Sequence, residues 1–248
     1  MNKIICGDIL AEMRKMDDGC VDLVVTSPPY NLKNSTGNGM KDGRGSKWTS
    51  ADDGLRKGYD KHEDSLSREE YIEWMKECVT EMFRVLKPSG AIFFNHKFRV
   101  QGGLMEGHPF LEPFNVRQMI IWSRAGGFNF NDSYFLPTYE VVYVMPKTAK
   151  GEGSFRLKKG GNKKGDVWRI NQEKKSLHPA PFPVELVDNI LTSCEGKVVL
   201  DPFGGSGTVA VSAIKNGWDY ILIDNSHEYC RMAEDRINSV ARVEGDWL

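Results

Sequence analysis

Short apolar runs alternate with longer amphipathic stretches along most of this chain. The apolar runs predict strands at residues 4–6, 22–26, 91–95, 116–122, 140–144, 197–200 and 220–223. The amphipathic stretches predict helices at 9–16, 67–86, 183–193, 207–216 and 227–240. Strands that alternate with helices in this way are typical of an α/β fold with a mostly parallel, doubly wound sheet.

The helix predicted to start at Ser67 has the clearest boundaries. Ser67 is a small polar cap followed by acidic residues, and Lys87-Pro88-Ser89-Gly90 is expected to end the helix. The apolar residues of this helix share one face, which predicts that they belong to the core: Ile72, Met75, Val79, Met82 and Phe83.

Composition narrows the class of protein. The chain has 248 residues and a net charge of −1, which suits a single domain over 1–248 with no global attraction for nucleic acid or membranes. Five scattered cysteines argue against a disulfide framework or a metal site, and we expect them to be buried small hydrophobes. Without a signal peptide or a membrane-length apolar run, we expect a cytoplasmic location.

A rigid turn follows the apolar run at 21–25. In Ser27-Pro28-Pro29-Tyr30, two consecutive prolines fix φ and remove two backbone donors, so the turn cannot join a helix. A hydroxyl lies on one side of the turn and an aromatic ring on the other. Such a turn can accept hydrogen bonds from a planar amine while it stacks on the ring that carries the amine.

A glycine-rich segment forms the second motif. Asp201-Pro202-Phe203-Gly204-Gly205-Ser206-Gly207-Thr208 lies between a predicted strand and a predicted helix, where glycines let the backbone approach a ligand closely. One strand later, Asp224 stands at a strand end, where a carboxylate can accept both hydroxyls of a ribose. Either acid alone would equally suit a helix cap, but together they favour a ribose-bearing cofactor.

These two motifs resemble the catalytic and S-adenosylmethionine motifs of DNA methyltransferases that modify exocyclic amino groups. Residues 27–30 match the (Asp/Asn/Ser)-Pro-Pro-(Tyr/Phe/Trp) motif, and residues 201–208 match the cofactor loop. The catalytic motif comes first by about 170 residues, a permuted order that resembles the β-group of this family. The resemblance implies a Rossmann-like class I methyltransferase fold, S-adenosyl-L-methionine as cofactor and double-stranded DNA as partner.

The resemblance also implies cofactor contacts outside the glycine-rich segment. Residues 7–8 resemble the motif that contacts the adenine end of the cofactor, and residues 178–183 resemble the segment that covers its methionine end. Residues 134–147, with Tyr139 and Glu140, look like the strand that carries aromatic residues near the target base. The full set of implied cofactor residues is Gly7, Asp8, His178, Pro179, Phe182, Asp201, Pro202, Phe203, Gly204, Gly205, Ser206, Gly207, Thr208 and Asp224.

The implied reaction needs no metal and no covalent intermediate. An exocyclic amine is a weak nucleophile because its lone pair is delocalised into the ring. The Ser27 hydroxyl and the Pro28 carbonyl could accept its hydrogens and orient the lone pair, with Pro29 fixing the turn. Tyr30 would stack on a base rotated out of the duplex. Methylation of cytosine at carbon 5 is excluded, because that family uses a Pro-Cys pair that this chain lacks.

The sequence leaves the target base open. A serine at the first motif position and the His-Pro-Ala-Pro-Phe-Pro form at 178–183 favour cytosine N4, and adenine N6 is the alternative. A methyltransferase acting on RNA or a small molecule, and an inactive DNA-binding relative, are less favoured. A homodimer and a role in restriction–modification also stay open.

DNA contacts are expected from three segments outside the motifs. Residues 31–65 are polar and lack periodicity, which predicts a mobile loop. Residues 147–176 form a short basic insertion, with ten Lys and Arg against three Asp and Glu over 147–175, that would bind phosphates and contribute to target recognition. Residues 97–137 would add sequence reading through Arg99, Gln101, Arg117, Arg124 and Asn129. We interpret the remaining histidines as surface or loop residues: His62, His96 and His108.

Overall fold

The structure is a computed structural model, and it describes residues 2–31, 66–101, 104–124, 132–133, 135–171 and 183–245. The side chains of residues 99–101 and 241–245 are outside this description. The predicted loop at 31–65 therefore lies outside it except for Asn31, as do His62, Asn129 and the segment 172–182.

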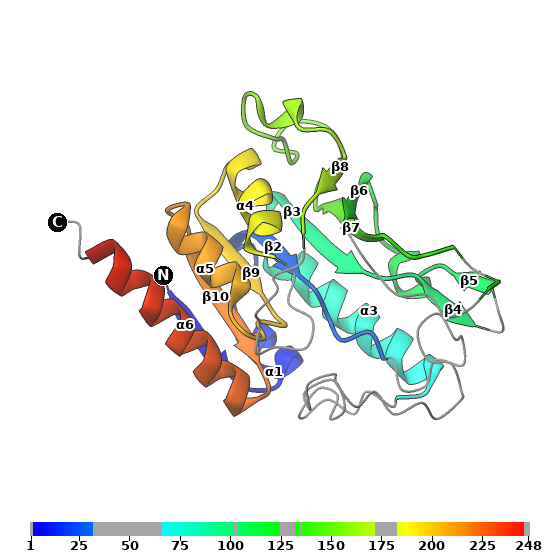
Figure 1. Cartoon of the computed structure of the whole chain (residues 1–248), viewed down its shortest axis with the longest axis horizontal. Coiled ribbons are helices and arrows are strands. Elements are labelled where there is room, and N and C mark those ends of the chain that lie inside the picture. Colours follow the sequence, from blue (N-terminus) through cyan, green and yellow to red (C-terminus); the bar gives the residue numbers. More distant parts are fainter. Residues whose placement is uncertain are drawn as a thin grey trace.

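A twisted central sheet organises the described part of the chain (Figure 1). Its eight strands, in spatial order, are β1 (Lys3–Cys6), β10 (Asp219–Asp224), β9 (Val198–Asp201), β2 (Val21–Thr26), β3 (Leu86–His96), β7 (Tyr139–Pro146), β6 (Gln118–Ser123) and β8 (Val167–Arg169). Neighbouring strands pair in parallel except at β7, which is antiparallel to both β3 and β6. The prediction of a mostly parallel sheet is confirmed.

Helices cover both faces of the sheet, so the fold has three layers (Figure 1). One hydrophobic cluster joins α1 (Ile9–Arg14) and α3 (Arg68–Val85) to the first face, through residues such as Met75 and Phe94. The other joins α4 (Val184–Ser193), α5 (Thr208–Lys215) and α6 (His227–Gly245) to the opposite face. This is the doubly wound arrangement that the alternating pattern predicts.

Most predicted elements are present, with shifted ends. Ser67 forms a full capping box with Glu70 at the start of α3, as expected from its sequence. The helix ends at Val85 and β3 begins at Leu86, so the segment 87–90 lies inside the strand rather than between the two elements. Five short elements were not predicted, because three residues carry too little pattern: β4 (Arg99–Gln101), β5 (Leu104–Glu106), β8 and the 3-10 helices η2 (Pro109–Leu111) and η3 (Gly161–Lys163).

The cysteine prediction holds for some cysteines and is wrong for another. Cys78, Cys194 and Cys230 are buried, but Cys6 is exposed. Cys6 is the last residue of β1, which is the outermost strand at its end of the sheet and therefore has a neighbour on one side only. Among the helices that the structure describes, none is long and apolar enough to cross a membrane.

The sheet has a topological switch point between β9 and β2. The chain leaves β9 toward α5 on one face, and it leaves β2 toward α3 on the other face. In open α/β sheets, diverging connections of this kind open a crevice at the carboxyl ends of the two strands, where ligands bind. The topology therefore places a ligand site where the two sequence motifs begin.

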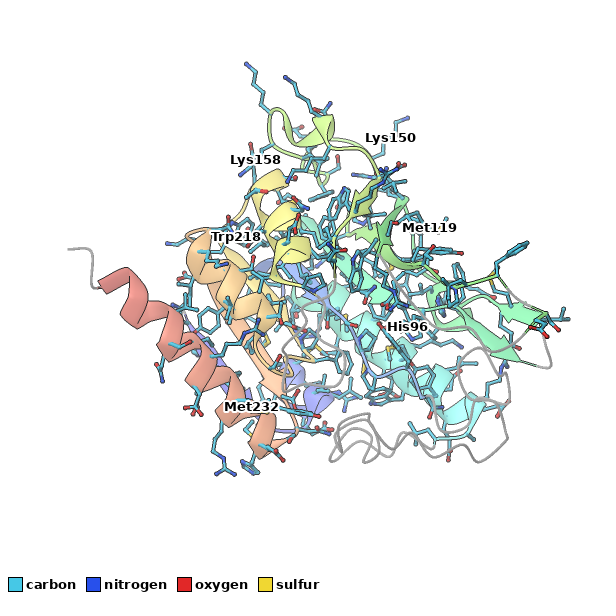
Figure 2. All side chains as sticks on the ribbon, in the orientation of Figure 1. His96, Met119, Lys150, Lys158, Trp218 and Met232 are labelled. Carbon is cyan, nitrogen blue, oxygen red and sulfur yellow. The ribbon has the colours of Figure 1, made fainter. Side chains whose placement is uncertain are left out.

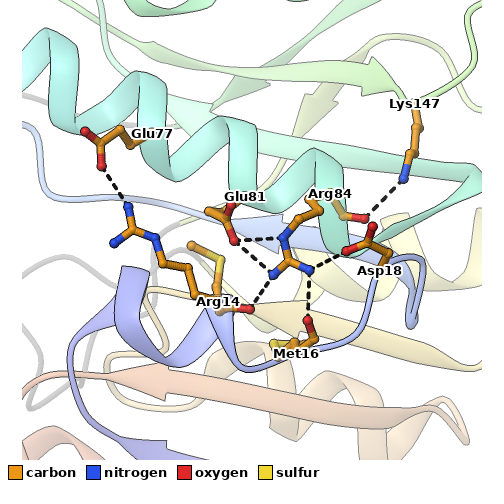
Figure 3. A network of polar contacts seen from close by, with 8 residues as sticks. Arg14, Met16, Asp18, Glu77, Glu81, Arg84 and Lys147 are labelled. Atoms are coloured by element: carbon orange, nitrogen blue, oxygen red, sulfur yellow. Dashed lines mark hydrogen bonds and ion pairs between the residues drawn. The ribbon is translucent and has the colours of Figure 1, made fainter.

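Arg84 connects the carboxyl end of α3 to the segment between α1 and β2 (Figure 3). Its guanidinium donates to the carbonyl oxygens of Met13 and Met16 at 2.6 and 2.8 Å, and to Asp18 Oδ1 at 2.6 Å. Its Nε also donates to Glu81 at 3.0 Å. A planar fork with several donors is needed to reach all these acceptors at once.

We expect Arg84→Lys to lower the free energy of unfolding by about 1–3 kcal/mol, because a single ammonium leaves carbonyls of the connection without donors. Urea unfolding of the purified variant measures this loss. The matched control is Arg14→Lys, since Arg14 pairs with Glu77 across an exposed surface. Its effect should stay below about 1 kcal/mol. Equal losses in both variants would contradict the role given to Arg84.

Candidate active site

The carboxyl ends of the parallel strands bring the two sequence motifs together. Thr26 at the end of β2 donates from Oγ1 to Asp201 Oδ1 at the end of β9, at 2.7 Å. The two residues are 175 positions apart in the sequence, and both are buried. The Ser27–Tyr30 turn therefore starts directly beside the start of the glycine-rich segment.

Asp201 is an interior carboxylate rather than a surface one. Only 2% of the residue is exposed, and its Oδ1 also accepts a hydrogen bond from the Phe203 backbone N–H at 3.1 Å. Burial raises the pKa of Asp201 to about 7, although the hydrogen bonds from Thr26 and Phe203 favour its charged form. Asp201 thus fixes the path of the chain from β9 into the glycine-rich segment.

The glycines of this segment are required by its geometry. Gly207 has φ +79°, and a Cβ placed there would lie 2.9 Å from the Ala233 side chain on α6. The Gly204 N–H donates to the Ile223 carbonyl at 2.9 Å, and the Gly205 N–H donates to Asp224 Oδ2 at 2.8 Å. The segment is therefore held tightly against the end of β10 before α5 begins at Thr208.

Asp224 presents a carboxylate that is anchored from two sides. Its oxygens accept the backbone N–H groups of Gly205 and Ser226, and burial raises its pKa. Each carboxylate oxygen has a further lone pair, so a pair of ligand hydroxyls can still donate to the group. Gly7 donates its N–H to the Asp224 carbonyl at 2.9 Å, so the end of β1 lies next to Asp224.

The other predicted cofactor residues have internal contacts or lie outside the described residues. The Asp8 side chain caps α1 by accepting the Ala11 N–H at 2.8 Å. The hydroxyls of Ser206 and Thr208 accept from Arg236 at 3.3 and 3.0 Å. His178, Pro179 and Phe182 are outside the described part of the chain.

The groups at this edge fit a ribose-bearing cofactor. They comprise the anchored Asp224 carboxylate, which can accept hydroxyl hydrogens, and Phe203, whose ring packs edge-on against Trp74 with centroids 5.8 Å apart. Within the described residues there is no cluster of three or more His, Cys, Asp or Glu side chains that could hold a metal ion.

Ser27, Tyr30 and Asn95 form a closed triangle of hydrogen-bonding groups. Ser27 Oγ lies 2.9 Å from the Tyr30 hydroxyl and 3.1 Å from Asn95 Oδ1, and the Tyr30 hydroxyl lies 3.0 Å from Asn95 Oδ1. Asn95 Nδ2 donates to the Val141 carbonyl at 3.1 Å, which turns Oδ1 toward the two hydroxyls. Asn95 was missed by sequence reasoning, although its place at the end of the strand next to β2 could have identified it.

The second proline is held from α3. The Tyr71 hydroxyl lies 2.8 Å from the Pro29 carbonyl oxygen and 2.9 Å from His96 Nε2. The His96 ring packs on Tyr30 with centroids 4.6 Å apart. Helix α3 and strand β3 therefore both fix the conformation of residues 27–30.

The interpretation of His96 as a surface or loop residue is wrong. His96 is 4% exposed, and Figure 2 labels it among the packed side chains in the middle of the molecule. Burial, with a smaller effect of His108, holds the pKa of His96 well below its usual value. His108 is half-buried, stacks on Phe98, and has a pKa lowered to about 4 by burial. The predicted strand stopped one residue too early to include His96, which shares a face with Phe94.

Glu140 lies at the start of β7 against the same turn. It is 5% exposed, and its Oε2 lies 3.5 Å from the Tyr30 hydroxyl. Its Oε1 forms ion pairs with Lys97 at 3.1 Å and Arg124 at 3.6 Å. Lys97 Nζ also lies 5.7 Å from the centroid of the Tyr30 ring.

Two arginines predicted to read DNA have internal partners. Arg124 pairs with Glu140, and the Arg117 guanidinium donates to the carbonyl oxygens of Phe155 and Ala149 at 2.9 and 2.6 Å. The side chains of Arg99 and Gln101 are outside the described set, and their role stays a prediction.

The described part of the basic segment begins at the amino edge of the sheet. The turn and the glycine-rich segment lie at the opposite, carboxyl edge. The Lys147 N–H donates to the Gly90 carbonyl near the start of β3, and the Lys158 N–H donates to the Ser193 carbonyl at the end of α4. Figure 2 shows Lys150 and Lys158 at one end of the molecule, away from His96. Only β8 returns toward the carboxyl edge, where the Ile170 N–H donates to the Ser123 carbonyl.

Asp201 predicts a pH-dependent stability. Its pKa is near 3.8 in an unfolded chain and about 7 in the fold, so the folded state binds more protons between these values. Stability from this group is complete below about pH 4 and is lost as the pH rises toward about 7. Asp201→Asn keeps the acceptor oxygen and cannot titrate. In ligand-free protein, the melting temperature of wild type minus that of Asp201→Asn should therefore fall between pH 4 and pH 7. A difference that is constant over this range would contradict the burial argument.

Comparison with known proteins agrees with this geometry. A family model described as DNA methylase, of the N6/N4 methyltransferases, matches residues 21–235. The type II methyltransferase M.BglII of Bacillus subtilis is 30% identical over 253 residues, covering 87% of this chain, which spans 63% of that protein. The DNA adenine methyltransferase YhdJ of Escherichia coli (strain K12) is 25% identical over 281 residues, covering 99% of this chain and 85% of that protein.

Solved structures share the fold. The PvuII DNA methyltransferase, described as cytosine-N4-specific, superposes with a TM-score of 0.72 at 16% identity, covering 96% of this chain and 90% of that one. Solved structures of the same fold hold S-adenosyl-L-methionine, the cofactor of these enzymes. The family match spans both motifs that meet at Thr26 and Asp201, and the chain belongs to the N6/N4 DNA methyltransferases.

Proposed function

We propose that the protein transfers a methyl group to the exocyclic amino group of a base in double-stranded DNA, with cytosine N4 as the preferred target. The observation that carries the proposal is the Ser27–Tyr30–Asn95 triangle, which lies directly after the Thr26–Asp201 hydrogen bond. That bond supports the proposal, because it brings the turn that we assign to the amine next to the segment that we assign to the cofactor.

The triangle prepares Ser27 as an acceptor. Asn95 Oδ1 can only accept, so the hydroxyl hydrogens of Ser27 and Tyr30 are drawn toward it. A lone pair of Ser27 Oγ is then available for an amino hydrogen of the base. The Pro28 carbonyl is the second acceptor in this proposal. Acceptors on the amino hydrogens localise the nitrogen lone pair and orient it, which lowers the barrier to methylation.

The bound S-adenosyl-L-methionine supplies an electrophilic methyl on its sulfonium. In our proposal Asp224 receives the ribose hydroxyls, while Asp201 and residues 202–208 shape the loop beside it. Gly7 and Asp8 would border the adenine end, and the methionine end is assigned to His178, Pro179 and Phe182. The anchored Asp224 carboxylate supports this placement.

An amine inside a DNA duplex cannot reach a turn at the bottom of a crevice, so the base must rotate out of the stack. We assign Tyr30 to stack on that base. Its ring is already positioned by His96, and its hydroxyl by Ser27 and Asn95. A preformed platform reduces the ordering that the rotated base would otherwise require.

Cytosine suits the charge around the turn. Ser27 is a neutral acceptor, and the Lys97 ammonium stands near the Tyr30 ring as a donor. On the base-pairing edge that carries its amine, cytosine offers two acceptors, the N3 nitrogen and the O2 carbonyl. The corresponding edge of adenine offers one acceptor, N1. Adenine N6 is the second candidate, and it is favoured by the similarity to YhdJ across nearly the whole chain.

The basic segment would bind DNA outside the target base pair. Its exposed cations include five for which the structure shows no carboxylate ion pair among the described residues: Lys150, Arg156, Lys158, Lys159 and Lys163. Their place at the amino edge of the sheet separates them from Ser27. Such cations contribute phosphate contacts that weaken as salt rises.

Methyl transfer to duplex DNA tests the function, with labelled S-adenosylmethionine and mass spectrometry of the product nucleosides. We expect N4-methyldeoxycytidine. N6-methyldeoxyadenosine would replace cytosine by adenine and leave the reaction class intact. Label on RNA alone, or on no nucleic acid, would overturn the proposal.

Ser27→Ala tests the role of the triangle. We expect the methylation rate to fall about 100-fold, the size of effect seen when one preorganised polar contact is removed from an active site. The dissociation constant of the cofactor should not change. The matched control is Ser154→Ala, which removes an exposed hydroxyl at the opposite edge of the sheet and should leave the rate as in wild type. A fully active Ser27→Ala would contradict the assignment.

A further inference from the structure

We propose that Glu140 takes up the proton that the target amine loses, through the hydroxyls of Ser27 and Tyr30. This inference rests on the proposed function and adds a destination for the proton. An amine that gains a methyl group while it keeps both hydrogens is positively charged and strongly acidic, because the ring withdraws its electrons. One hydrogen must leave for the neutral product to form, and it must pass to a base at the site.

Among the described residues, the contacts of the Ser27 hydroxyl lead to a carboxylate through Tyr30. Ser27 Oγ contacts the Tyr30 hydroxyl and Asn95 Oδ1. Asn95 is an amide without a basic site, and its Nδ2 is held by the Val141 carbonyl. Asp201 faces Thr26 and the Phe203 N–H on the other side of β2. Tyr30 contacts both Ser27 and a carboxylate, that of Glu140.

The fold buries Glu140 beside the Tyr30 hydroxyl and gives it charged partners. It is 5% exposed at the first residues of β7, and two cations, Lys97 and Arg124, neutralise its second oxygen. The link between the Tyr30 hydroxyl and Glu140 Oε2 is 3.5 Å, the longest of the relay. Such links are often long in a free enzyme and shorten when the substrate binds. An acidic methylated amine can protonate a carboxylate even when cations face it.

The proton transfers balance. The amine N–H bond breaks as its hydrogen binds Ser27 Oγ, and the original Ser27 hydrogen turns from Asn95 Oδ1 to the Tyr30 oxygen and passes to it. The original Tyr30 hydrogen turns in the same way from Asn95 Oδ1 to Glu140 Oε2 and passes to it, so both hydroxyls are regenerated. The product amine becomes neutral, and the carboxylate becomes a carboxylic acid. After the product leaves, the reverse path through the Tyr30 and Ser27 hydroxyls returns the proton to water at the vacated site, and Glu140 regains its charge.

A double-mutant cycle tests the relay: Glu140→Gln, Tyr30→Phe and both together, each in single-turnover methylation of duplex DNA. Glu140→Gln keeps the shape and removes the base. We expect each single variant to be about 10- to 100-fold slower, the usual size of a general acid–base contribution. The double variant should be no slower than the slower single variant, because Glu140 acts only through Tyr30. Cofactor and DNA dissociation constants should stay within about twofold of wild type, so the loss falls on kcat rather than on KM.

Three controls make the result decisive. Glu106→Gln changes a glutamate that pairs with Arg68 elsewhere, and it should keep the wild-type rate. Thermal melting of each variant checks that it is folded. Where Glu140→Gln is unstable, the cycle is repeated in a Lys97→Met background, which removes the positive charge that Glu140 no longer neutralises. Rates that multiply in the double variant, or a Glu140→Gln variant as fast as wild type, would overturn the relay. A wild-type protein that methylates no DNA would instead overturn the proposed function.

Discussion

A single buried hydrogen bond, from Thr26 Oγ1 to Asp201 Oδ1, determines how the two functional motifs of this protein meet. It joins the ends of two neighbouring parallel strands that are far apart in the sequence. On one side of it the chain enters the Ser27–Tyr30 turn, and on the other it enters the glycine-rich segment. Because Asp201 is almost fully buried, this bond has no competition from water, and its loss would leave a polar group unsatisfied in the interior.

The topology explains why these particular strands meet. β9 continues to α5 on one face and β2 continues to α3 on the other, an arrangement that in open α/β sheets opens a crevice for ligands. The Ser27–Tyr30 turn precedes the glycine-rich segment in the chain, and their two strands are still neighbours in the sheet. The two motifs therefore meet because their strands are neighbours in the sheet, whatever the order of the motifs along the sequence.

Much of the fold and the centre of the site could be predicted from the sequence. The alternation of elements, the Ser67 cap and the two motifs all have strong local patterns, and the structure brings Thr26 and Asp201 together as parallel strand ends require. Residues that act through contacts distant in the sequence carry no such pattern. Asn95, Tyr71 and His96 converge on the turn from β3 and α3, and only the packing of those elements shows it. The basic segment carries charge without a pattern that places it in the fold, and its role in binding DNA stays a prediction.

The central claim is that the turn and the glycine-rich segment form one site across the Thr26–Asp201 bond. The most direct measurement is a crystal structure of the protein with S-adenosylhomocysteine, the demethylated form of the cofactor. The account predicts that the ribose hydroxyls bind the Asp224 carboxylate and that the sulfur faces Ser27 and Pro28. A ligand whose sulfur points away from this turn, or one bound elsewhere on the sheet, would contradict it.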